Sequence, residues 1–189
     1  MARAGLSADR LTEAAADLAD EVGFENVTVS ALARHFGVKD ASLYSHIRNA
    51  QDLRVRLAVL ALSELADQAA AAIAGRSGKD ALVAFAGAYR RYAHEHPGRY
   101  TATQMALDPD TVATGPSERH ADLTRAVLRG YRLWEPDETD AVRFLHSTLH
   151  GYVTLERAGA FHSHPRGVEA SWLRALDALD SLLSDWPAG

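Results

Sequence analysis

Side chains that can bind nucleic acid are concentrated in one short stretch of the sequence, residues 39–46. They are Lys39, Ala41, Ser42, Tyr44, Ser45 and His46. A lysine can reach a guanine edge or a phosphate, and tyrosine and histidine can donate hydrogen bonds to phosphate oxygens. Alanine and serine are small enough to let a helix approach the base pairs closely. These residue types suit a helix that lies in the major groove of DNA.

The residues before and within this stretch predict the two helices that would position it. An apolar stripe at helical spacing runs through Val29, Leu32, Ala33 and Phe36. Thr28 can cap the first amides of that helix, and Gly37 can take the left-handed conformation that ends it. A second helix over 40–47 would bury Leu43 and Ile47. The pattern predicts a helix-turn-helix, with an ordinary helical hairpin as the alternative.

The charge of this segment differs from that of the whole chain. The 189 residues include 20 basic and 25 acidic ones, a net charge of -5, which argues against a protein that coats nucleic acid nonspecifically. Residues 28–56 reverse the balance, with five basic residues against two acidic ones. The basic residues are Arg34, Lys39, Arg48, Arg54 and Arg56. A local net charge of +3 suits contact with phosphates.

The remaining sequence predicts helices only. Capping and apolar patterns place them at about 7–23, 49–73, 79–96, 99–107, 118–133, 137–158 and 167–184. Asn49 is expected to cap the second of these, with Asp52 reciprocating. We expect an all-α fold with a helix-turn-helix DNA-binding domain over residues 1–48. A larger helical domain would follow over residues 49–189.

Composition limits the other classes of protein. The 47% hydrophobic content is enough for a large core, and the absence of cysteine excludes a disulfide framework and a thiolate metal site. No stretch has the length of apolar residues that a membrane span needs, and residues 1–6 lack the apolar core of a signal peptide. We therefore expect a cytoplasmic protein that makes no membrane contact.

The run from Gly37 to Ile47, followed by Asn49 and Leu53, closely resembles the signature of the tetracycline-repressor (TetR) family of bacterial regulators. The resemblance implies a repressor that binds a palindromic double-stranded DNA operator as a homodimer. It also implies a small-molecule effector in the larger domain, which changes the separation of the two recognition helices. Thr28 and Tyr44 would contact phosphates, and the side chains named above in residues 39–46 would form the reading face.

Two positions depart from the family pattern. Members usually carry a lysine just after the cap of the fourth helix, where it meets a phosphate, and this chain has Ala50. Arg48 or the amides of that helix N-terminus could take its place. Near the end of the chain, His150-Gly151 is similar to the tryptophan-histidine-glycine C-terminal subtype, but His146 stands where the tryptophan of that subtype is expected.

The resemblance also implies an effector pocket among the middle helices. Candidate lining residues are Phe85, Tyr89, Tyr92, Tyr100, Gln104, Met105, Trp134, Phe144, His146 and His150. Each aromatic residue could instead belong to the core, because aromatic residues at helical spacing usually pack there. His146 and His150 lie one turn apart, a spacing that can hold a metal, but the sequence identifies no third ligand. We therefore expect no metal and no cofactor.

The apolar faces of the last two helices predict contact between two copies of the chain. These faces comprise Leu145, Leu149, Tyr152 and Leu155 on one helix, and Trp172, Leu176, Leu179 and Leu183 on the other. They exceed what one short hairpin can bury, so a symmetric four-helix contact is expected.

Two other interpretations stay open. The chain could be a dimeric ligand-binding or interaction module without DNA function, which Ala50 slightly favours, or a helical-bundle metal enzyme that uses His146 and His150. The sequence contains none of the usual catalytic motifs, so we expect no enzyme.

Overall fold

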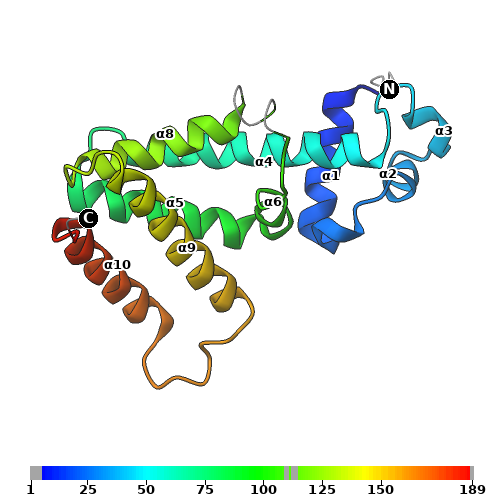
Figure 1. The fold of residues 1–189 in the computed structure, drawn as a ribbon. Helices are drawn as coiled ribbons and strands as arrows, with labels where there is room; N and C mark the ends of the chain where they lie inside the picture. The colour runs from blue at the N-terminus through cyan, green and yellow to red at the C-terminus, as the bar shows by residue number, and fades with distance from the viewer. Residues whose placement is uncertain (1–5, 109–110, 112–114, 188–189) are drawn as a thin grey trace. The chain divides into compact units, whose positions relative to one another are not determined.

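The computed structural model describes residues 6–108, 111 and 115–187, and the helices of this part are shown in Figure 1. They are α1 (Ala8–Val22), the short 3-10 helix η1 (Phe24–Asn26), α2 (Val29–Phe36), α3 (Asp40–Leu43), α4 (Ala50–Ile73), α5 (Gly78–Glu95), α6 (Pro97–Ala102), α8 (Pro116–Arg129), α9 (Asp137–Arg157) and α10 (Val168–Ser184). The predicted all-α fold is confirmed. Within the described residues, none of these helices is long and apolar enough to cross a membrane.

Contacts between residues divide the chain into two compact units. Among the described residues, the first unit comprises residues 6–64, 95–108, 111 and 115–117, and the second comprises residues 65–94 and 118–187. Helix α4 contributes its first part to one unit and its last part to the other. The predicted boundary at residue 48 separates the part that binds DNA from the rest of the chain. A division by packing does not test it, so it stays a prediction.

The first unit packs α1, α2, α3 and the beginning of α4 around one apolar core. The side chains of Leu11, Leu32, Leu43 and Leu57 are fully buried in it, and Ile47 is 2% exposed. Burying one such side chain contributes about 2 kcal/mol to folding. The short helix α3, which could not form alone, is therefore fixed by Leu43 and Ile47.

One carboxylate holds α6 against α1 in the same unit. Asp20 Oδ1 accepts hydrogen bonds from the N–H groups of Gly98 and Arg99, each at 2.9 Å, at the beginning of α6. Asp20 Oδ2 also lies 3.1 Å from His96 Nδ1. Gly98 permits this approach, because a Cβ atom there would lie 1.9 Å from the backbone oxygen of Ala19.

Two predicted boundaries are wrong in this region. The helix predicted over 79–96 ends at Glu95, one residue before the expected end, but the helix predicted to begin at residue 99 already begins at Pro97. Proline suits this position, since it lacks only an N–H that would have no partner within the helix. The predicted helix over 99–107 stops at Ala102, and the N–H groups of Gln104 and Met105 donate to carbonyls three residues earlier, not four.

The second unit packs α5, α8, α9 and α10 with the end of α4. The fully buried side chains include Leu82 and Phe85 of α5, Leu145 and Leu149 of α9, and Leu183 of α10. Helices α9 and α10 run side by side and are joined by residues 158–167 (Figure 1).

Arg90 links three helices of this unit. Its guanidinium donates to both carboxylate oxygens of Glu156 at 2.6 and 2.8 Å, and to Glu169 at 2.6 Å. It also lies 5.0 Å from the centroid of the Trp172 ring. The hydrogen bond from Arg90 lowers the pKa of Glu156.

The apolar faces predicted for a dimer contact are mostly used inside the chain. Of those residues, the buried ones are Leu145, Leu149, Trp172, Leu176, Leu179 and Leu183. Leu155 is 49% exposed and Tyr152 is half-buried. The large apolar side chains that are exposed on these two helices are, besides Leu155, Phe144, Leu173 and Leu182. Helical spacing identified apolar faces but could not tell which of them pack within the chain.

Candidate nucleic-acid interface

Helix α2 is fixed at both ends by its own sequence. Thr28 Oγ1 accepts a hydrogen bond from the Ala31 N–H at 3.1 Å, and Gly37 adopts the left-handed conformation with φ 66°. The N–H groups of Gly37 and Val38 donate back to carbonyls of α2 at 3.1 and 2.9 Å. The predicted cap and stop are confirmed. Because the Thr28 hydroxyl oxygen accepts in this cap, its O–H can still donate to a phosphate.

Helix α3 is shorter than the predicted 40–47. After Leu43 the chain continues as a turn, and the N–H groups of His46 and Ile47 both donate to the Leu43 carbonyl, at 2.9 and 3.1 Å. These bonds keep residues 44–47 coiled. As predicted, Leu43 and Ile47 are buried.

The side chains of the predicted reading face all reach the surface. Lys39, Ala41, Ser42, Tyr44 and Ser45 are exposed, and His46 is half-buried. Tyr44 is 52% exposed. The structure therefore presents these side chains to solvent, as a DNA-reading face requires. Their contact with DNA stays a prediction.

A hydrogen bond that the sequence did not predict connects α2 to α3. Ser30 Oγ donates to Asp40 Oδ2. Asp40 is the acidic residue within the candidate reading segment, and an unpaired carboxylate there would repel phosphates. The Ser30 hydroxyl occupies one of its oxygens and fixes the side chain against α2.

Two of the basic residues in segment 28–56 are engaged in folding contacts. The Arg54 guanidinium donates to the Glu25 carbonyl at 3.1 Å and lies 3.6 Å from the Glu25 carboxylate. Arg56 Nε lies 3.3 Å from Asp52 Oδ2. Part of the local charge of +3 is therefore paired within the chain.

Three other basic side chains of the segment reach solvent. Arg34 and Lys39 are exposed, and the Arg48 side chain is 87% exposed although it lies 3.6 Å from Asp52. Arg34 was not among the predicted site residues. Its position in the last turn of α2, close to the turn that leads into α3, could have identified it. Ala50, where a lysine was expected, is the first residue of α4 and is exposed.

The beginning of α4 is closed by a reciprocal pair of side chains. The Asp52 N–H donates to Asn49 Oδ1 at 2.8 Å, and the Arg48 N–H donates to Asp52 Oδ2 at 3.0 Å. This backbone hydrogen bond from Arg48 lowers the pKa of Asp52, and Arg56 adds to the effect. The predicted cap is confirmed, with Asp52 reaching the amide before Asn49. The Arg48 backbone is thereby fixed while its side chain extends into solvent.

Known proteins match both parts of this chain. Residues 11–57 match the model of bacterial regulatory proteins of the tetR family, and residues 82–179 match the model "Tetracyclin repressor-like, C-terminal domain". The chain is 38% identical over 160 residues to the HTH-type transcriptional regulator Rv0681 of Mycobacterium tuberculosis, covering 82% of this chain and 72% of that protein. The chain belongs to the TetR family. It is therefore a DNA-binding transcriptional regulator with a helix-turn-helix, in a family of regulators and not of enzymes.

A second relative supports the membership of this TetR-family protein, and a solved structure shares its fold. The HTH-type transcriptional regulator YobS of Bacillus subtilis is 33% identical over 159 residues, covering 84% of this chain and 83% of that protein. The structure of a TetR protein from Acinetobacter baumannii in complex with minocycline matches with a TM-score of 0.70 and 20% identity. That match covers 98% of this chain and all of the other, and it shows the shared fold.

The second unit of this TetR-family protein contains a buried polar cluster. The rings of His120 and His146 have centroids 5.1 Å apart, and Phe85 and Tyr89 lie 5.8 and 6.2 Å from His120. Thr124 Oγ1 donates to the His120 carbonyl at 3.1 Å and lies 3.0 Å from His146 Nε2. The threonine oxygen must then accept from His146, which places a proton on Nε2 of that ring.

The two histidines of this cluster are held in the neutral form. Burial, and secondarily the nearby His146, lowers the pKa of His120 to about 4, and burial lowers the pKa of His146. His120 Nδ1 is buried and has no hydrogen-bond partner among the described residues. His120 was not a predicted site residue. A lone histidine in a polar helix gave no signal of its partner on α9.

The predicted pocket residues divide between the two units. Phe85, Tyr89 and Tyr92 are buried on α5, and His146 lies in the histidine cluster, with His150 half-buried one turn further along α9. In the first unit Tyr100 is buried, Met105 packs on the core and Gln104 is exposed. Trp134 is 64% exposed, and the exposed Phe144 ring contacts Trp186 with centroids 6.1 Å apart. Effector binding by any of these residues stays a prediction.

The spacing of His146 and His150 does not lead to a metal site in the described part of the chain. There, no group of three or more histidine, aspartate or glutamate side chains is arranged to hold a metal ion. The close partner of His146 is another neutral histidine, His120, and not a carboxylate.

Proposed function

We propose that the protein is a ligand-responsive repressor that binds a palindromic operator as a homodimer. The observation that carries the proposal is the exposed polar surface of residues 39–46 on a segment that matches the TetR DNA-binding model. In this account Lys39, Ser42 and Ser45 read base edges with Ala41 beside them. Tyr44 and His46 donate to phosphates or bases, and Thr28, Arg34 and Arg48 contact phosphates.

The domain boundary and the subtype belong to the same proposal. We assign DNA binding to residues 1–48 and effector binding and dimerisation to residues 49–189. We also assign the second part to the tryptophan-histidine-glycine subtype, on the basis of His150-Gly151. In this chain His146 replaces the tryptophan and pairs with His120.

Lys39→Ala and Tyr44→Ala are each expected to weaken operator binding by roughly 10- to 100-fold, because each removes a direct DNA contact. Fluorescence anisotropy with a palindromic fragment from upstream of the protein's own or neighbouring gene measures the effect. Measurements on Lys39→Ala also show whether Lys39 contacts a phosphate or a base. If Lys39 contacts a phosphate, its removal should lower the salt dependence of binding by about one ion, whereas if it contacts a base, its removal should relax the sequence preference.

Lys79→Ala is the matched control for Lys39→Ala. Lys79 lies in the second unit, where its ammonium is 2.8 Å from Asp177, so operator affinity should stay unchanged. Equal affinities for wild type, Lys39→Ala and Tyr44→Ala would contradict the proposed reading face. A folded dimer that binds no DNA would instead favour the interaction module to which Ala50 gives some support.

The outer face of α9 and α10 is the proposed dimer contact. Phe144 and Thr148 of α9 border a shallow hollow of about 260 Å³ with Ala178 and Leu182 of α10. On the same stripe of α9, a Cβ atom at Gly151 would meet nothing within 4 Å. Small residues beside large exposed ones let helices of a second copy approach closely, as in a four-helix contact.

Ala178→Arg is expected to convert the dimer to a monomer, because it places a charge in the centre of this contact. Sedimentation at micromolar concentration measures the change. Ala178 is exposed in the single chain, so the fold should survive. Ala126→Arg, an identical change at an exposed position of α8, should leave the dimer intact. A monomeric wild type, or a dimeric Ala178→Arg protein, would contradict the proposed contact.

The buried cluster of His120, His146, Thr124 and Tyr89 is the proposed polar end of the effector site. It offers an unpaired ring nitrogen among aromatic side chains, a typical composition for a small-molecule site. The minocycline complex of the structurally similar TetR protein is consistent with a small effector. An effector that favours a recognition-helix separation other than the ~34–36 Å of one DNA turn would lower operator affinity by linkage.

A further inference from the structure

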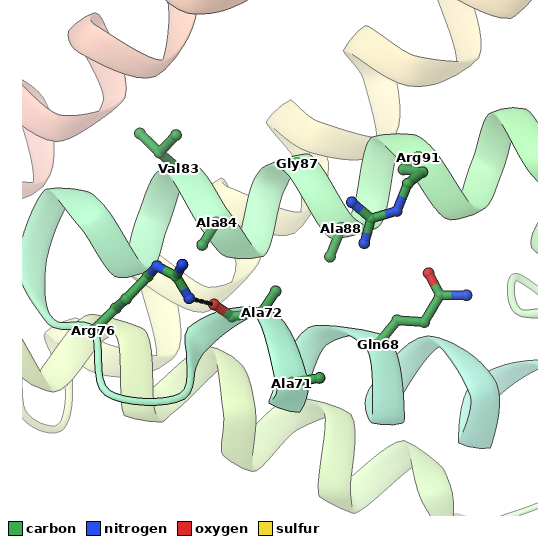
Figure 2. A pocket seen from close by; sticks show the side chains of 9 residues that line it. All are labelled: Gln68, Ala71, Ala72, Arg76, Val83, Ala84, Gly87, Ala88 and Arg91. Atoms are coloured by element: carbon green, nitrogen blue, oxygen red, sulfur yellow. Dashed lines mark hydrogen bonds between the residues drawn. The ribbon is translucent and has the colours of Figure 1, made fainter.

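A groove between α4 and α5 in the second unit is lined by two arginines. It has a volume of about 550 Å³. Figure 2 shows Arg91 of α5 and Gln68 of α4 at one end and Arg76 at the other, above a floor of alanines and Gly87. None of the described residues that line the groove is an aspartate or a glutamate. Such a concave, positively charged surface raises the local concentration of anions.

The arginines of this groove are available to a ligand. Arg90 and Arg91 are consecutive on α5, but two glutamates hold Arg90, whereas Arg91 is exposed and forms no ion pair with a described residue. Arg76 Nη1 donates to the Ala72 carbonyl (Figure 2), which positions its guanidinium and leaves its other N–H groups free for a ligand. A guanidinium binds a carboxylate or phosphate group through two parallel hydrogen bonds.

Gln68 adds an acceptor that lacks a donor. Its Oε1 atom is buried and has no hydrogen-bond partner among the described residues. Buried polar atoms are nearly always paired, so an N–H or O–H of a bound molecule or of solvent can complete this one. The neighbouring Arg91 guanidinium is exposed and turned over the groove (Figure 2).

Gly87 keeps the floor of the groove open. It lies in the middle of α5, where alanine would favour the helix. A Cβ atom at Gly87 would meet nothing within 4 Å, so packing inside the chain does not require glycine. The missing side chain therefore leaves space that a bound molecule can occupy.

We propose that this groove binds a small multivalent anion, a carboxylate or phosphate that also carries an O–H or N–H donor. Its acidic groups pair with Arg76 and Arg91, its donor reaches Gln68 Oε1, and its body lies over the alanine floor. The site shares no residue with the DNA-reading face or with the cluster of His120 and His146, so it is independent of the proposed function.

Isothermal titration calorimetry on the full chain tests this site with three anions. Citrate carries three carboxylates and a hydroxyl, tricarballylate is the same molecule without the hydroxyl, and pyrophosphate replaces carboxylates by phosphates. We expect citrate or pyrophosphate to bind with a dissociation constant of about 1 mM or tighter. Tricarballylate should bind several-fold more weakly than citrate, since it has no hydroxyl for Gln68 Oε1.

Two variants and a control show whether the anion binds in this groove. Arg91→Gln should weaken binding of the tighter anion about tenfold or more. Arg129→Gln, which removes the same charge at an exposed position of α8, should leave it unchanged. Gly87→Leu should abolish binding without lowering the thermal unfolding midpoint, because its side chain fills open space.

Two kinds of result would overturn the site. One is the absence of binding for citrate and pyrophosphate at ~10 mM. The other is equal affinity in wild type, Arg91→Gln and Gly87→Leu. Equal affinities for citrate and tricarballylate would contradict the proposed hydrogen bond from the citrate hydroxyl to Gln68 Oε1.

Discussion

Gly98→Ala is expected to lower the free energy of unfolding of the first unit by roughly 3 kcal/mol or more, as a severe case of overpacking. The added Cβ would lie 1.9 Å from Ala19 O, 2.1 Å from Ala19 C and 2.6 Å from Asp20 N. These are backbone atoms of α1, so no side chain can rotate away. Separating α6 from α1 would also break the hydrogen bonds from the amides of Gly98 and Arg99 to the Asp20 carboxylate. Urea denaturation followed by circular dichroism measures the loss.

Gly87→Ala is the matched control for this substitution. The same methyl group enters open space in the middle of α5, where replacing glycine raises stability by about 1 kcal/mol through helix propensity. The two variants should therefore shift the unfolding midpoint in opposite directions. A Gly98→Ala protein as stable as wild type would show that α6 does not lie against α1 as described.

The stability of the protein is expected to fall as the pH drops from about 6.5 towards 4, and His120 is expected to be a principal cause. The ordinary pKa of the histidine is 6.5, whereas burial lowers the pKa of His120 in the folded chain to about 4. Between these values the unfolded state binds a proton that the folded state excludes, so acid favours unfolding. The full difference in pKa corresponds to roughly 3 kcal/mol.

Urea denaturation of wild type and His120→Phe across pH 7 to 4 tests this expectation. The variant keeps an aromatic ring beside Phe85 and Tyr89 but cannot bind the proton, so its stability should fall less over this range. His35→Phe makes the same chemical change at an exposed position and should retain the wild-type pH dependence. Parallel curves for wild type and His120→Phe would contradict the buried, neutral state of His120.

Local signals predicted the candidate interface well because its determinants lie within a few residues of one another. The Thr28 cap, the Gly37 stop and the Asn49 cap each depend on short-range hydrogen bonds, and each is found in the structure. Residues 44–47 were expected to be helical because Leu43 and Ile47 have helical spacing. A coiled turn keeps the same spacing, so periodicity could not separate the two.

Contacts between distant segments could not be predicted in this way. The bond from Asp20 to the start of α6, 78 residues later, and the pairing of His120 with His146 depend on tertiary packing. The sequence did show apolar residues at helical spacing on α9 and α10. The sequence could not show that Trp172 packs inside the chain while Leu182 stays exposed, since both lie at helical intervals.

The same limit applies to the predicted effector pocket. In the sequence, Trp134 and Phe144 were as good candidates for lining the pocket as Phe85 and Tyr89, because all four are aromatic. The structure exposes the first two and buries the others. The polar partners of His146 come from α8, which the sequence presented as an ordinary charged helix. Burial depends on which helices meet, and single-sequence periodicity does not contain that information.

The most direct test of the central claim is a titration of fluorescently marked palindromic DNA from upstream of the protein's own or neighbouring gene. We predict one dimer per palindrome and an affinity at physiological salt roughly a thousandfold or more above that for a scrambled fragment of equal length and composition. Equal affinity for the two fragments, or no binding by a protein shown to be folded, would contradict sequence-specific recognition by the exposed residues 39–46.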